Sequence, residues 1–144
     1  MSSYRAPMRS RLPSVDPTLA VERALSTGLV GIGGRLSAVP TDAAAAAART
    51  ADVYDERTAR RLERFVAMPE GSEVWTRDPH GLFHRGTVTG GWSYDASAEA
   101  HAADLVHVRP CDWDAHALEE HRVPSAVAVT FRRGGRNFQR IHQV

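Results

Sequence analysis

The chain has 144 residues, of which 42% are hydrophobic and 24% charged, and its formal net charge is +1. These values are typical of one folded globular domain. No apolar run approaches the roughly 20 residues that a membrane-spanning helix needs. The single cysteine, Cys111, excludes an internal disulfide, a CxxC motif and a cysteine-rich zinc site, although mixed His/Asp metal sites remain open.

The first 15 residues combine Pro7 and Pro13 with scattered arginine and serine. We expect a flexible basic arm with little structure of its own, followed by one domain over residues 16–144. Basic residues near the start are not followed by an apolar stretch, which argues against a secretory signal and favours a cytoplasmic protein.

The remaining N-terminal half predicts two helices separated by a strand. Asp16, Pro17 and Gly28 bracket a short helix, and residues 29–37 resemble a strand interrupted by glycines. After Pro40, Thr41 and Asp42 can cap a longer helix that ends near residue 68. Its outer side carries Arg57, Arg60, Arg61 and Arg64. These arginines either face a polyanion or, as is more common, form a solvated face paired with Glu56 and Glu63.

The C-terminal half predicts closely spaced strands with turn signals between them. The strands are expected at residues 73–77, 82–89, 105–109, 127–131 and 137–142. Short, even spacing favours a small barrel or a strongly curled sheet. The predicted fold class is α+β, a pseudo-β-barrel of about five to six strands with two main helices from the N-terminal half.

One stretch of this half, "GTVTGGWSY" at residues 86–94, indicates a binding site. Gly90 and Gly91 interrupt a strand and clear space, while Trp92 and Tyr94 share one side of the following extended segment. Planar aromatic side chains beside a bare backbone suit a flat ligand such as a nucleobase. The alternative is that these aromatics, like Trp75, fill the barrel interior.

The end of the chain is basic. Five arginines and no acidic residue lie between residues 122 and 144. Three of them sit around the turn "RRGGR", so we expect this turn to contact nucleic-acid phosphates, through Arg132, Arg133 and Arg136.

The sequence shows no catalytic constellation. A nucleophile elbow, a P-loop and a complete G-x-G-x-x-G are absent, no histidine spacing predicts a metal site, and Cys111 has no base beside it. We therefore expect a protein that binds without turnover and needs no cofactor or metal. His84 and His107 are the pair to watch, because both lie mid-strand and could point into one pocket.

The order of these segments resembles the EVE-type branch of the PUA-like superfamily. The elements are a glycine-rich "GIGGRL" strand end, a helix ending in "LERFVAMPEGSEV", the stretch "GTVTGGWSY", a Val-to-Trp element at Val108 and Trp113, and "RVP" at residues 122–124. Ser72-Glu73 stands where Gly-Asp is usual. The resemblance covers residues 28–142.

This resemblance implies a PUA-like pseudo-barrel that binds nucleic acid or a modified nucleobase in an antiphage or DNA/RNA-modification system. No nuclease motif accompanies it, so a reader, or a small specificity subunit for a partner protein, is the expected role. The expected ligand-binding residues are Gly34, Arg35, Trp75, Gly90, Gly91, Trp92 and Tyr94. The alternatives are a protein-interaction subunit without a pocket, whose partner surface is the acidic segment 95–121, and a small enzyme using an unrecognised His/Asp pair.

Overall fold

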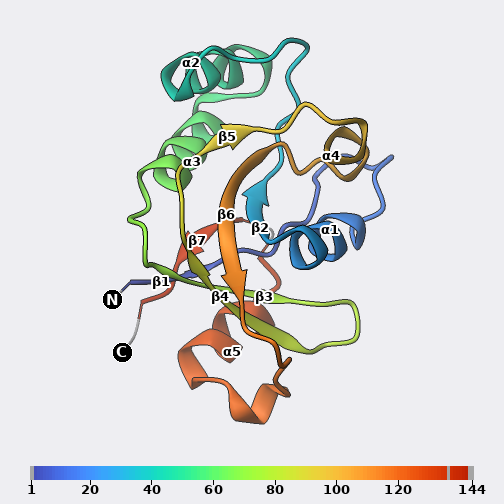
Figure 1. Cartoon of the computed structure of the whole chain (residues 1–144), viewed down its shortest axis with the longest axis vertical. Helices are drawn as coiled ribbons and strands as arrows, with labels where there is room; N and C mark the ends of the chain where they lie inside the picture. The colour runs from blue at the N-terminus through green and yellow to red at the C-terminus, as the bar shows by residue number, and fades with distance from the viewer. Residues whose placement is uncertain (1, 136, 143–144) are drawn as a thin grey trace.

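The computed structural model describes residues 2–135 and 137–142, which form an α+β fold around one curled, mixed sheet (Figure 1). Five α-helices, seven strands and one 3-10 turn are found among these residues. In chain order they are β1 (Ser3–Arg5), α1 (Leu19–Thr27), β2 (Leu29–Ile32), α2 (Ala43–Val53), α3 (Glu56–Ala67), β3 (Glu73–Arg77), β4 (Phe83–Val88), β5 (Ser93–Tyr94), α4 (Ala98–Ala103), β6 (His107–Trp113), η1 (Glu120–Arg122), α5 (Ser125–Arg132) and β7 (Gln139–Arg140).

The sheet has the strand order β2-β6-β4-β3-β1-β7, with β5 added to β6 off this path. Only β1 and β3 are parallel; every other pair is antiparallel. The first half of β6 pairs with β2 and β5, whereas its last three residues pair with β4. Since β6 changes partners along its length, the sheet curls, in keeping with the predicted barrel-like architecture (Figure 1).

The N-terminal half holds three helices, not two. Asp42 caps α2 by accepting from the backbone N–H of Ala45 at 2.7 Å, as the sequence predicts. Asp55 then caps a separate helix, α3, by accepting from Thr58. The single long helix expected between residues 41 and 68 is therefore broken at Tyr54, because an aspartate side chain competes for backbone N–H groups and starts a new helix.

The strand predicted at residues 127–131 is wrong, because this segment lies in helix α5. Val127 and Ala128 are buried, and Phe131 packs against the same cluster. Apolar residues at i, i+1 and i+4 share one helical face, and Pro124 is compatible with the start of a helix. Packing of that face against Phe83 and Trp75 outweighs the strand preference of the two valines.

The N-terminal segment is not an arm without structure. β1 lies between β3 and β7, and Arg5, which is 4% exposed, donates hydrogen bonds to the carbonyl groups of Thr130 and Asn137. Residues 6–12 continue from β1 over the end of the sheet; we call them the strap. Long-range strand pairing, which local composition does not reveal, orders this segment.

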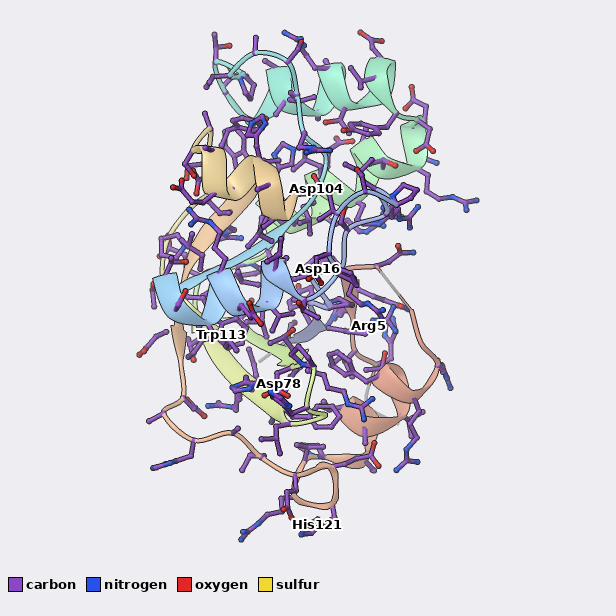
Figure 2. The ribbon with its side chains drawn as sticks, turned by 90° about the vertical axis from the view of Figure 1, so that its right-hand side faces the viewer. Arg5, Asp16, Asp78, Asp104, Trp113 and His121 are labelled. Atoms are coloured by element: carbon purple, nitrogen blue, oxygen red, sulfur yellow. The ribbon has the colours of Figure 1, made fainter. Side chains whose placement is uncertain are left out.

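Two buried clusters hold the fold together. The larger joins the strap and α1 to the sheet and to Phe65 of α3, and Trp92 and Trp113 pack against its edge. The smaller lies between α5 and the β3–β4 hairpin and contains Trp75. Figure 2 shows Asp104 and Asp78 well apart, one near the α2–α3 end and the other in the half that holds the β3–β4 hairpin.

Candidate functional site

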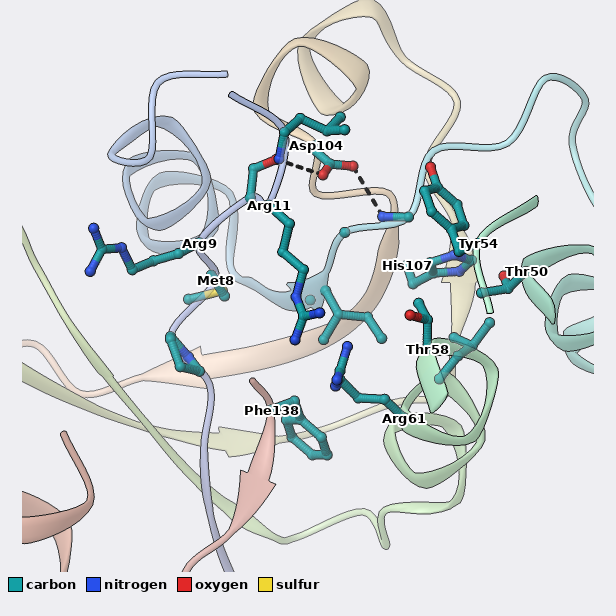
Figure 3. A pocket seen from close by; sticks show the side chains of 18 of the residues that line it. Met8, Arg9, Arg11, Thr50, Tyr54, Thr58, Arg61, Asp104, His107 and Phe138 are labelled. Carbon is teal, nitrogen blue, oxygen red and sulfur yellow. Dashed lines mark hydrogen bonds between the residues drawn. The ribbon is translucent and has the colours of Figure 1, made fainter. Parts of the chain in front are cut away.

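A cavity of about 100 Å³ lies beneath the strap, between the end of β2, the start of β6 and helices α2 and α3 (Figure 3). We call it the strap pocket. Its apolar wall includes Ile32, Leu62 and Phe138, and its polar wall includes Arg11, Arg61 and His107. The volume is well below the 300–1,000 Å³ of sites for drug-sized ligands. One water needs about 10–15 Å³ by the same kind of measure, so the pocket suits a single ring or a small anion.

His107 presents a hydrogen-bond donor to the strap pocket. The Trp92 indole Nε1–H donates to His107 Nδ1 at 3.2 Å. Because an indole nitrogen can only donate, Nδ1 must accept, and the proton of the neutral ring lies on Nε2. His107 is 1% exposed, and Nε2 makes no hydrogen bond of good geometry within the described part of the chain, although the Gly34 backbone lies close enough to favour the protonated ring.

The His107 ring is held neutral by its surroundings. Burial lowers the pKa of His107 to about 4, and the Gly34 backbone and the Asp104 carboxylate oppose this shift only in part. The ring is therefore uncharged at physiological pH, and Nε2–H is a neutral donor toward whatever occupies the pocket.

Trp92 and Tyr94 support the pocket from behind without lining it. Trp92 stacks on His107 with ring centroids 6.1 Å apart, and Tyr94 meets the same ring edge-on at 5.4 Å. The Tyr94 hydroxyl accepts from the backbone N–H of Leu36 at 2.9 Å, which fixes the chain just after β2. Neither aromatic side chain lines the strap pocket, as direct contact with a ligand there would require; they instead hold the His107 ring and the Leu36 backbone.

Asp104 ties together the two chain segments that frame the pocket mouth. One carboxylate oxygen accepts from the Gly34 N–H at 3.0 Å, and the other accepts from the Ser10 hydroxyl of the strap at 2.7 Å. A Cβ on Gly33 would lie 2.6 Å from the Asp104 carboxylate, so this close approach requires glycine.

Two guanidinium groups point toward one another across the cavity, Arg11 from the strap and Arg61 from α3 (Figure 3). Burial, followed by the charges of Arg11 and Arg64, lowers the pKa of Arg61. Arg61 is 8% exposed, yet it forms no hydrogen bond or ion pair within the described part of the chain, and its buried Nε has no partner. An unpaired buried charge is costly, so an acceptor-rich or anionic ligand would stabilise this arrangement.

Most of the other predicted ligand-binding residues lie away from the cavity. Gly34 lines it, whereas the Arg35 side chain donates to the His101 carbonyl at 3.0 Å. Trp75 is buried in the smaller cluster, where its indole donates to Glu73. Gly90 and Gly91 also lie outside the strap pocket: Gly90 packs on Pro110, and nothing lies within 4 Å of a Cβ placed on Gly91.

Helix α5, which ends at Arg132, lies at the opposite end of the molecule from α2 (Figure 1). Arg132 pairs with Glu120 at 3.3 Å, and Arg133 is exposed at the end of α5. Arg136 lies outside the described residues.

His84 and His107 do not converge. Gly86 pairs with Trp113, so His84 lies about eight residues, or roughly 25 Å, from His107 along the direction of β6. His84 instead contacts Asp78 at 2.9 Å. Cys111 is buried, and burial raises the pKa of its thiol to about 12, which makes it a poor nucleophile. Within residues 2–135 and 137–142, no group of three or more His, Cys, Asp or Glu side chains could hold a metal ion.

Sequence reasoning missed Ser10, Arg11, Asp104 and the lining role of His107, and it placed Arg61 on the outer side of its helix, whereas the structure buries Arg61 in the pocket wall. One signal was present. Arg61 lies four residues before Phe65 and next to Leu62, so helical spacing places it beside the apolar stripe of α3.

The chain matches no family model, and neither a curated protein nor a solved structure is significantly similar to it. None of the helices among the described residues is long and apolar enough to cross a membrane.

Proposed function

We propose that this protein binds a single nucleobase, plain or modified and carried by a nucleic acid, in the strap pocket, and that it does so without catalysis. The observation that carries the proposal is the pair of buried, unpartnered nitrogens in one ring-sized cavity, His107 Nε2 and Arg61 Nε. Both are donors, so the ligand must offer acceptors.

A nucleobase meets the requirements of this wall. Its edge carries carbonyl and ring-nitrogen acceptors, and its faces are apolar enough to pack on side chains such as Phe138 and Leu62. The phosphates beside it would meet the positive charge of Arg11 and Arg61. A cavity with unsatisfied donors also favours ligand binding over a protein-interaction subunit whose pocket is filled.

The test is binding of nucleosides and short oligonucleotides, measured by calorimetry and by fluorescence anisotropy. The informative variant is His107→Asn. Its side-chain oxygen can still accept from Trp92 Nε1–H, but the donor toward the pocket is lost. We expect nucleoside affinity to fall about tenfold, the value of one neutral hydrogen bond.

His84→Asn is the matched control, because His84 lies outside the pocket and its substitution should leave affinity unchanged. The proposal would be wrong if canonical and modified nucleosides fail to bind, or if His107→Asn binds them as tightly as the unmodified protein does.

A further inference from the structure

Helix α3 presents a line of arginines that leads out of the strap pocket. Arg57, Arg61 and Arg64 occupy positions i, i+4 and i+7, so they lie along one side of the helix. Arg61 reaches into the pocket, while Arg57 and Arg64 are exposed. With Arg11 of the strap they form what we call the arginine face. The four groups are close enough that Arg11, Arg64 and Arg57 all act on Arg61.

No carboxylate forms an ion pair with this face in the part of the chain that the structure describes. Glu56 and Glu63, which the sequence places within reach of these arginines, form no ion pair with them in the described part of the chain. Asp55 is the one acidic residue that acts on Arg61, and its carboxylate accepts from the Thr58 N–H at the helix cap. Arg132, by contrast, is paired with Glu120. Excess positive charge is therefore concentrated beside the pocket mouth.

We propose that the arginine face holds the phosphates of a single strand of nucleic acid whose base occupies the strap pocket. This inference rests on the proposed function. Arg57 and Arg64 lie seven residues, or about 10 Å, apart along the helix axis. The two side chains can therefore meet different phosphates of one strand. Arg61 stands between the base and the strand, at the point where the flipped nucleotide leaves it.

The experiment compares two double variants, Arg57→Gln/Arg64→Gln on the arginine face and Arg132→Gln/Arg133→Gln at the end of α5. Both pairs are exposed, so unchanged urea midpoints should show that each variant folds normally. Affinity for single-stranded DNA and RNA oligonucleotides is measured from 50 to 300 mM salt, and affinity for the free nucleoside at one salt concentration.

Each phosphate contact on a single strand contributes about 0.7 to the slope of log K against log salt. Arg57→Gln/Arg64→Gln should lower the magnitude of that slope by about 1.4 for oligonucleotides and leave nucleoside binding unchanged. Arg132→Gln/Arg133→Gln should alter neither. An unchanged slope in the first variant, or a reduced slope in the second, would overturn the inference.

The failure of the inference can be told apart from failure of the proposed function. If the nucleoside binds but Arg57→Gln/Arg64→Gln leaves the salt slope of oligonucleotide binding unchanged, the base pocket is supported and the phosphate path is wrong. If oligonucleotides bind through the arginine face while no nucleoside binds, the phosphate path stands and the base pocket is wrong. Absence of both kinds of binding rejects both.

Discussion

The neutral state of His107 makes the stability of this protein depend on pH in a calculable way. The ring is buried against Trp92, and its pKa is about 4 in the folded chain against about 6.5 when exposed. As pH falls below 6.5, His107 becomes protonated in the unfolded chain, whereas in the folded chain it stays neutral until pH approaches 4. Stability therefore holds above pH 6.5 and is lost progressively between pH 6.5 and 4.

The size of the effect follows from the two pKa values. Linkage between about 6.5 and about 4 gives a loss of about 2 kcal/mol from pH 8 to pH 5, and about 3 kcal/mol once both states are protonated. Two kilocalories are a large part of the 5–15 kcal/mol that stabilise a typical domain. The window above pH 5 also precedes the protonation of most carboxylates.

Urea unfolding at several pH values between 8 and 5, followed by circular dichroism, measures the loss directly. The comparison is between the unmodified protein and His107→Asn, which keeps an acceptor for Trp92 and does not titrate. The other histidines contribute equally to both proteins. We expect the variant to lack about 2 kcal/mol of the pH dependence. Parallel stability curves for the two proteins would show that His107 is not buried in its neutral form.

Two further predictions concern close packing around the sheet. Gly33→Ala should lower the free energy of unfolding by about 1–3 kcal/mol, because the new methyl group meets Asp104. Gly91→Ala is the control: its methyl group meets nothing within 4 Å, so the free energy of unfolding should change by less than about 0.5 kcal/mol. Arg109→Lys should cost about 2–4 kcal/mol, because the guanidinium donates from Nε to the Gly90 carbonyl and from Nη1 to the Phe65 and Met68 carbonyls, and an ammonium at one point cannot occupy both donor positions. Urea titrations measure both effects. Equal urea midpoints for Gly33→Ala and Gly91→Ala would contradict the first prediction, and an Arg109→Lys midpoint equal to that of the unmodified protein would contradict the second.

Elements with local signals could be predicted from the sequence alone. The cap at Asp42 begins a helix, residues 73–77 form β3, and the run after Gly81 forms β4 close to the predicted bounds. Capping and alternation act over a few residues, so they can be read without the fold. The curled sheet also follows the predicted spacing of short strands.

The position of the site, in contrast, depends on long-range packing. β1 depends on pairing with Glu73–Trp75, about 70 residues away, and α5 depends on burial of its apolar face against β3 and β4. The strap pocket brings Arg11, Arg61, and the pair Asp104 and His107 together from three separate segments. The aromatic stretch after Gly90-Gly91 lies near this region, but Trp92 and Tyr94 contact His107 and do not line the pocket. The pairing of β5 with β6 places their side chains against His107. Contacts between residues far apart in the chain leave no periodic trace in sequence, so the unpaired charge of Arg61 becomes visible only once the fold has buried it.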